Sequence, residues 1–238
     1  MMFPIYKREM RAYFISPIGY TFIAVFLAVS GGLFSLTTAW METADVATYF
    51  TFMIFMFTVL IPLLTMKLFS EERKTKTEQI LLTSPVSLFG IVIAKFLAAF
   101  TLYAATMTLS CLINYSVLTS VSGKSPVFSQ FFGNFIGILF LGAAFIAVGV
   151  FMSAITENQV VSAVATFGVI LLMMVVNFVI SLIGNAFIRT ILKWFSVVDR
   201  YTFFTRGIFS LPAIIYFVSL VIIFLFLTAR VYEMRRWN

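Results

Sequence analysis

Long runs of apolar residues, separated by short polar stretches, dominate this chain. Six such runs cover residues 18–40, 47–68, 88–118, 130–154, 159–182 and 211–232. A helix needs about 20 apolar residues to cross the hydrocarbon core of a bilayer. Backbone inside a bilayer must satisfy its own hydrogen bonds, and none of the runs shows the strict alternation of a barrel strand. We therefore predict an all-α integral membrane protein, with six transmembrane helices in one domain over residues 1–238.

Two further segments have an amphipathic pattern typical of helices that lie along a membrane surface. In residues 1–16, aromatic and apolar residues recur at helical spacing opposite a charged face. The charged residues of this predicted interfacial helix are Lys7, Arg8, Glu9 and Arg11. Over residues 184–210, a basic side chain recurs after four residues, Asp199-Arg200 interrupts the pattern, and residues 201–208 form a possible second helix. This segment is predicted as a re-entrant or interfacial hairpin that contains Arg189, Lys193, Asp199 and Arg206.

The connection between the second and third runs is unusually rich in charge. Its charged residues are Glu71, Glu72, Arg73, Lys74, Lys76 and Glu78. Thr77 is placed to cap a turn, and the apolar Ile80, Leu81 and Leu82 follow although no span begins there. Lipid or a groove on another protein must cover these apolar residues. We predict a short amphipathic helix over about 70–83; the alternative is a solvated loop whose charges only fix the topology.

Composition excludes several classes of protein and several kinds of site. The chain is 62% hydrophobic and 11% charged, with a mean hydropathy of +1.08, which excludes a soluble globular protein. Its net charge of +7 comes from basic residues at the ends of the apolar runs, where they meet lipid headgroups, so we expect no nucleic-acid partner. With no histidine and one cysteine, Cys111, the chain offers no zinc site and no histidine-based catalysis. We predict no metal ligand and no catalytic residue.

The distribution of basic residues predicts the orientation. Eleven Lys and Arg residues lie on the side of the two termini and of residues 69–88, and five lie on the opposite side. The positive-inside rule then places both termini in the cytoplasm. Lys67 and Lys95 fall near the cytoplasmic ends of their runs, and we expect their long side chains to reach water.

Within the runs, small and polar residues point to helix packing. The small residues Ala24, Ala28 and Gly32, and also Gly133 and Gly137, permit close helix approach, either at a subunit interface or within the chain. Asn114, Asn134 and Asn177 are expected to form interhelical hydrogen bonds. The spans contain no carboxylate, which disfavours an ion-coupled carrier.

Three sequence blocks resemble the permease subunits of ABC-2 type exporters, particularly the gliding-motility branch. They are Lys7-Arg8-Glu9 with residues 13–20, residues 69–85, and Arg230-Val231 with residues 235–237. They occur in the family's order and span nearly the whole chain. The chain also lacks the GxxxxGK[ST] phosphate-binding loop, so energy from ATP has to come through a partner.

This resemblance implies a separate role for each of three segments of the chain. Residues 1–16 would be a cytoplasmic connecting helix, 70–83 a coupling helix that docks on a cytoplasmic ATPase, and 184–210 an extracellular hairpin. Glu71, Glu72 and Arg73 would position the coupling helix through charge pairs, and residues 80–82 would enter a groove of the ATPase. Two permeases, as identical copies or paralogues, and two ATPases would form the transporter, with ATP and Mg bound by the ATPases.

The expected function is therefore export across a bacterial inner membrane, in contact with membrane lipids and with a possible envelope accessory subunit. Two alternatives stay open: an ABC permease that transmits mechanical work to an envelope or motility machine without moving a solute, and a polytopic carrier or scaffold outside the ABC class.

Overall fold

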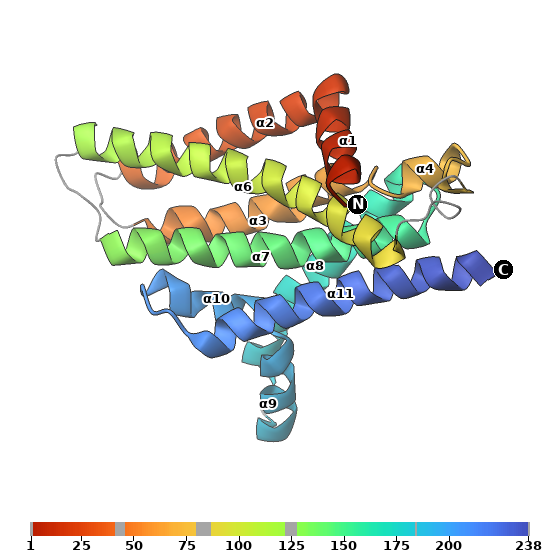
Figure 1. Ribbon diagram of the computed structural model, residues 1–238. Helices are drawn as coiled ribbons and strands as arrows, with labels where there is room; N and C mark the ends of the chain where they lie inside the picture. Colours follow the sequence, from red (N-terminus) through yellow and green to blue (C-terminus); the bar gives the residue numbers. More distant parts are fainter. Residues whose placement is uncertain (1, 41–45, 80–86, 122–127, 184, 238) are drawn as a thin grey trace.

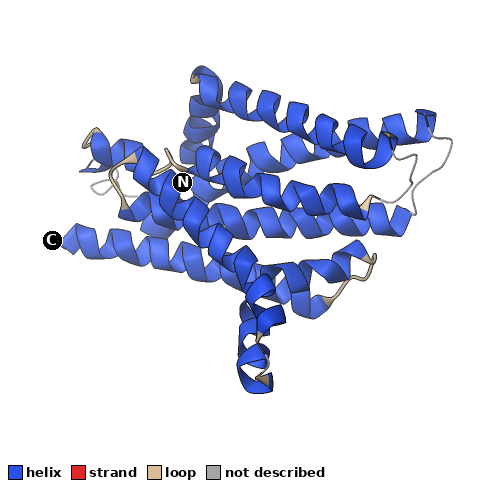
Figure 2. Cartoon of the chain, turned by 180° about the vertical axis from the view of Figure 1, so that it is seen from behind, coloured by secondary structure: helices blue, strands red, loops and turns tan. Residues whose placement is uncertain are grey.

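The computed structural model describes residues 2–40, 46–79, 87–121, 128–183 and 185–237, and within these ranges the regular structure is helical (Figure 2). The chain begins with α1 (Met2–Ile15) and α2 (Pro17–Phe34), which a π-helix, η1 (Ser35–Ala39), extends. The remaining helices are α3 (Ala47–Thr65), α4 (Ser70–Lys74), α6 (Leu88–Val121), α7 (Phe128–Ile155), α8 (Gln159–Leu182), α9 (Ala186–Phe195), α10 (Val197–Thr205) and α11 (Leu211–Trp237).

Six of the described helical segments are long and apolar enough to cross a membrane, as the sequence predicted. They begin with Pro17–Thr38 and end with Leu211–Arg236. The all-α membrane class is therefore confirmed. The main difference in length concerns the last helix, which runs to Trp237 instead of ending near 232. Arg235 and Arg236 extend it beyond the apolar part, and cations in the last turn of a helix interact favourably with its dipole.

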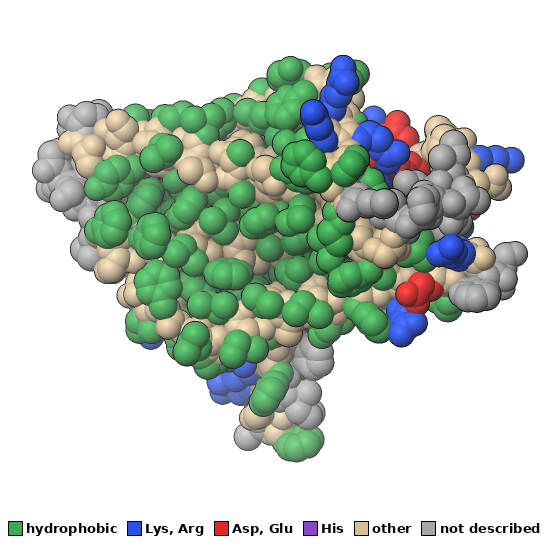
Figure 3. All heavy atoms as spheres, in the orientation of Figure 1, with side chains coloured by type: hydrophobic (Ala, Val, Ile, Leu, Met, Phe, Trp, Pro, Cys, Tyr) green, Lys and Arg blue, Asp and Glu red, His purple; other side chains and the backbone are tan. Residues whose placement is uncertain are grey.

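Helix α7 forms the centre of the bundle and packs against α3, α6, α8, α10 and α11 (Figure 1). All residues from 141 to 150 are buried. Glycines make this close packing possible: a Cβ atom at Gly142 or Gly149 would collide with the side chain of Tyr103 or Thr65. On the face shown in Figure 3, apolar side chains cover much of the surface along the helices, whereas charges gather mainly at the end that carries both termini.

Two of the three asparagines in the spans form the predicted interhelical hydrogen bonds. The Asn114 amide donates to the hydroxyl of Tyr49 at 3.0 Å and to that of Ser30 at 3.3 Å, which joins α6 to α3 and α2. The Asn134 carbonyl oxygen accepts from the hydroxyl of Tyr201 at 3.0 Å, which joins α7 to α10. These bonds satisfy polar groups that would be costly to leave unpaired in an apolar bundle.

The two groups of small residues have different surroundings. A Cβ atom at Gly137 would lie 2.6 Å from Cβ of Phe204, and one at Gly133 would lie 2.8 Å from the Phe204 carbonyl oxygen, so these glycines admit α10. By contrast Gly32 has nothing within 4 Å of such an atom, and Ala24 and Ala28 are exposed. Packing within the chain therefore explains the glycines of α7 but not the small residues of α2.

The segment before the last span folds as two short helices, and α9 projects away from the bundle (Figure 1). The structure contains the helical pair that the sequence predicted, but the break expected at Asp199-Arg200 and the second helix expected over 201–208 were misplaced. The break lies at Ser196, whose side chain accepts a hydrogen bond from the Asp199 backbone N–H at 3.2 Å and caps α10. Capping lets α10 begin at Val197, so Asp199 and Arg200 belong to the helix.

Candidate functional site

The corner between α3 and α4 is fixed to the central helix α7 by one serine. The Ser153 hydroxyl oxygen accepts hydrogen bonds from the backbone N–H groups of Phe69, at 3.0 Å, and Ser70, at 3.2 Å. These N–H groups lie at the start of α4, where a helix leaves its first donors without partners. Ser153 therefore sets where α4 begins relative to the membrane bundle.

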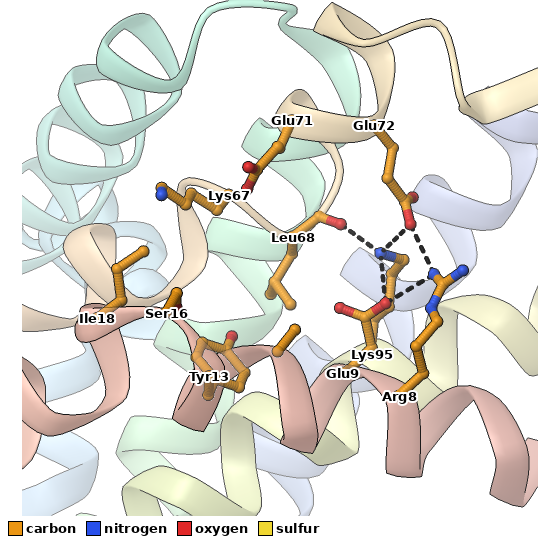
Figure 4. A pocket seen from close by; sticks show the side chains of 11 residues that line it. Arg8, Glu9, Tyr13, Ser16, Ile18, Lys67, Leu68, Glu71, Glu72 and Lys95 are labelled. Carbon is orange, nitrogen blue, oxygen red and sulfur yellow. Dashed lines mark hydrogen bonds and ion pairs between the residues drawn. The ribbon is translucent and has the colours of Figure 1, made fainter.

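Four charged side chains from three helices meet beside this corner (Figure 4). Lys95 of α6 places its Nζ atom 3.1 Å from Oε1 of Glu9 on α1 and 3.0 Å from Oε1 of Glu72 on α4. Arg8 of α1 lies 2.8 Å from Glu9 and 2.7 Å from Glu72. We call Arg8, Glu9, Glu72 and Lys95 the ion cluster. It joins the N-terminal helix, the charged connection and a membrane span.

Lys95 is the most deeply buried member of the ion cluster. Its side chain is only 1% exposed, and Nζ also donates to the carbonyl oxygen of Leu68 at 2.5 Å. It lies 4.9 Å from the centre of the Phe69 ring, within range of a cation–π interaction. A buried ammonium group needs partners of this kind because the loss of hydration alone would be prohibitive.

The ion cluster is electrically balanced, with two cations and two carboxylates. Burial alone would lower the pKa of Arg8, but its hydrogen bonds and charge interactions with Glu9 and Glu72 raise that pKa overall. Each carboxylate bridges both cations through its Oε1 atom, so the loss of one member would leave an uncompensated charge in a largely buried site. Oε2 of Glu72 is buried without a hydrogen-bond partner in the described part of the chain.

Two further ion pairs fasten the connection after α3 to other parts of the bundle. Arg73 pairs with Glu157 in the turn between α7 and α8 at 2.8 Å, and also donates to the carbonyl oxygen of Ile155 at 2.5 Å. Near the C-terminus, Arg235 of α11 pairs with Glu78 at 3.1 Å. Residues 70–79 are therefore held by α1, α6, α11 and the α7–α8 turn.

The residues predicted for this site separate into two groups. The structure brings Arg8, Glu9, Glu72, Arg73 and Glu78 into ion pairs. Side chains of the second group are exposed, and none of them forms an ion pair within the described ranges; they are Lys7, Arg11, Glu71 and Lys74.

The predicted helix over 70–83 is not continuous in the described residues. Helix α4 ends at Lys74, and Lys76 has a φ of 58°, in the left-handed region that commonly ends helices. Thr75 donates from its hydroxyl to the carbonyl oxygen of Glu71 at 2.9 Å, and Thr77 donates to that of Glu72 at 3.3 Å. Thr75 is therefore the C-cap residue of α4, and Thr77 adds a hydrogen bond to a carbonyl oxygen of its last turn. The apolar residues 80–82 (Ile80, Leu81 and Leu82) lie outside the described residues.

Three members of these ion pairs were missed by sequence reasoning. Lys95 was expected to reach water, but it is buried and paired. Its position inside an apolar run was the available signal, since ionisable residues in spans usually have a specific partner. Glu157 and Arg235 carried no such signal because their partners lie far away in sequence.

The ion cluster borders an open cavity of about 320 Å³ between α1 and the connection after α3. Tyr13 lies on its wall and donates from its buried hydroxyl to the carbonyl oxygen of Leu64 at 3.2 Å. Burial raises the pKa of Tyr13, which keeps this hydroxyl protonated as a donor. Lys67 and Glu71 line the same cavity outside the network of contacts drawn in Figure 4.

Comparison with known families identifies one match over most of the chain. A family model described as "ABC-2 family transporter protein" matches residues 10–236, which include all six candidate spans and two members of the ion cluster, Glu72 and Lys95. No curated protein matches the chain significantly.

Proposed function

The chain belongs to the ABC-2 family of transporter membrane proteins, and we propose that it is the permease subunit of an ABC exporter. In this proposal the six spans form the membrane pathway, and a partner ATPase binds ATP and Mg and supplies the energy. The sequence supports this division because it contains no GxxxxGK[ST] loop with which to hold nucleotide phosphates.

The observation that carries the proposal is the attachment of residues 70–79 to the bundle. Glu72, Arg73 and Glu78 connect this short segment to α1, α6, the α7–α8 turn and α11. A force applied to the segment would act on all of these elements at once, since the charged contacts hold it at several points. Residues 70–83 therefore act as the coupling segment, and Ile80, Leu81 and Leu82 supply its apolar contact with the ATPase.

Helix α1 has the role of a connecting helix in this proposal. It lies across the start of α2 (Figure 1), and its Arg8 and Glu9 reach the coupling segment and α6. Its remaining charged residues, Lys7 and Arg11, are exposed and suit the headgroups of the cytoplasmic leaflet. The bias of basic residues supports an inner-membrane protein with both termini in the cytoplasm.

A second permease, as an identical copy or a paralogue, completes the pathway. The small residues of α2 support this step because they face away from the chain's own helices. Ala24, Ala28 and Gly32 recur every four residues and so lie along one side of the helix. Small residues in such a row permit close contact between transmembrane helices of two subunits.

Reconstitution with an ATPase tests the proposal. The chain would be co-expressed with a candidate partner P-loop ATPase from the same genome, purified through a tag on the chain, and placed in nanodiscs. We expect a stable complex whose ATPase rate differs from that of the ATPase alone. If no complex forms with that ATPase, the proposal is wrong. A coupled complex that moves no solute would instead support a mechanical transmitter.

A further inference from the structure

A second charged region lies between α8, α9 and α10, away from the ion cluster. Residues of these helices line an open pocket of about 540 Å³. Basic side chains are visible beside α9 in Figure 3. The polar and charged residues that line the pocket are Asn177, Arg189, Lys193, Asp199, Arg200, Thr202 and Arg206, together with the apolar Ile180 and Phe203.

The charges of this pocket are not balanced. Four cations line it, with Asp199 as its one carboxylate, and none of the four forms an ion pair in the part of the chain that the structure describes. At the other end of the protein, Arg8, Arg73, Lys95 and Arg235 all pair with carboxylates. Cations that line one cavity without ion-pair partners repel each other, and an anion would relieve this repulsion.

Helix dipoles do not explain why four cations line this pocket. Lys193 lies in the last turn of α9, where a cation is favoured. Arg189 and Arg200, however, lie near the starts of α9 and α10, where the dipole disfavours a cation. Arg189 and Lys193 are also one turn apart, so two like charges share one side of α9. Arg200 is held with its guanidinium carbon 5.8 Å from the centre of the Tyr216 ring.

The donor set indicates the kind of anion. Guanidinium groups match the oxygens of phosphate in a bidentate geometry, and a phosphate group offers several acceptor oxygens to more than one cation. The pocket volume falls within the range of small-molecule sites. Phe187 and Trp194 of α9 are 75% and 69% exposed, and exposed aromatic side chains of this kind are typical of a membrane interface.

We propose that the pocket between α8, α9 and α10 binds a phosphate group, carried by a lipid headgroup or free in solution. The cations bind the phosphate oxygens, the Asn177 side chain adds a further donor, and Asp199 limits the affinity. This site is independent of the coupling segment, so it stands or falls separately from the proposed transport function.

Calorimetric titration of the full-length chain in zwitterionic detergent, at constant ionic strength, tests this site. The probes are inorganic phosphate and a short-chain phosphatidylglycerol. The Arg189→Gln/Arg200→Gln variant should weaken binding about tenfold or more, because charge-assisted hydrogen bonds are lost. The matched control Lys74→Gln/Arg236→Gln removes the same charge from exposed positions at the other end and should bind as the wild type does.

A second variant changes affinity in the opposite direction without removing a cation. Asp199→Asn raises the net positive charge of the pocket and should tighten binding about threefold. Saturable binding of phosphatidylglycerol alone would identify a lipid headgroup as the source of the phosphate, whereas binding of inorganic phosphate would show that the free group suffices. The inference is overturned if neither probe binds the wild type, or if the pocket variant and the control lose affinity equally.

Discussion

The Nζ atom of Lys95 lies 3.0 Å from Oε1 of Glu72, and this contact links a membrane span to the short helix α4. Lys95 is nearly inaccessible to solvent, and its other carboxylate partner, Glu9, comes from α1. The pair therefore lies where the N-terminal helix, the coupling segment and α6 meet. A charge buried at such a junction ties the three elements to one arrangement.

Loss of the buried cation should destabilise the protein. Lys95→Met leaves Glu9 and Glu72 facing each other with only Arg8 to balance them. Breaking a buried ion pair from one side costs about 3 kcal/mol or more. Lys74→Met removes an exposed cation from α4 and is the control. Unfolding in detergent, followed by tryptophan fluorescence, measures both variants; equal stabilities would contradict the buried cluster.

The contact between α7 and α10 should be intolerant of any added volume. Gly137→Ala places a methyl group against the ring and Cβ of Phe204, and overpacking of this kind costs about 1–3 kcal/mol. Gly32→Ala makes the same change where nothing lies within 4 Å, so we expect little or no loss. The comparison uses thermal unfolding of the two variants, and a larger loss at Gly32 would refute the packing described for α10.

Self-association should depend on the exposed small residues of α2. Gly32→Leu adds bulk on the side where Ala24 and Ala28 also lie, and should reduce the dimer fraction at least about tenfold. Val25→Leu is a control at a position already occupied by a larger side chain on the same helix. Light scattering or cross-linking in nanodiscs reports the dimer. Unchanged association of the Gly32 variant would remove this side of α2 from the proposed interface.

The proposed orientation can be read from two engineered cysteines. The native Cys111 is 4% exposed and should stay silent towards an impermeant thiol reagent. Trp40 is 80% exposed and follows η1, which extends α2 away from the end that carries the termini, and Lys76 lies in the exposed turn after α4 (Figure 1). In intact cells we expect Trp40→Cys to react from outside, and Lys76→Cys to react only after lysis. The reverse pattern would invert the topology.

Hydropathy was sufficient to predict the spans because the bilayer requires about 20 apolar residues whatever the neighbouring helices are. It could not separate Gly137 from Gly32, since only the packed bundle shows which small residue admits another helix. The helix expected over 70–83 ends early because Lys76 adopts a left-handed conformation. Lysine seldom adopts this conformation, so the sequence did not indicate the end of the helix.

Site residues could be predicted from the sequence where several charged residues stand close together, but not where a charged residue stands alone. Glu72 and Arg73 stood out because they lie in a charged connection within an apolar chain. Lys95 was expected to reach water, and only the fold reveals that carboxylates from two other helices surround it. Glu157 and Arg235 likewise find partners 84 and 157 residues away, at separations that no local pattern encodes.

The central claim is that work from the ATPase passes through the ion cluster. A comparison of substitutions at two neighbouring glutamates tests this claim most directly. Glu72→Gln removes the charge that contacts Lys95 and Arg8, whereas Glu71→Gln removes the same charge from an exposed side chain one residue away.

The measurement is the stimulation of ATPase activity by the permease in the reconstituted complex. We expect Glu72→Gln to co-purify with the ATPase yet lose about tenfold in stimulation, and Glu71→Gln to retain it. If both variants kept the wild-type stimulation, or if both lost it equally, the ion cluster would not transmit the work of the ATPase.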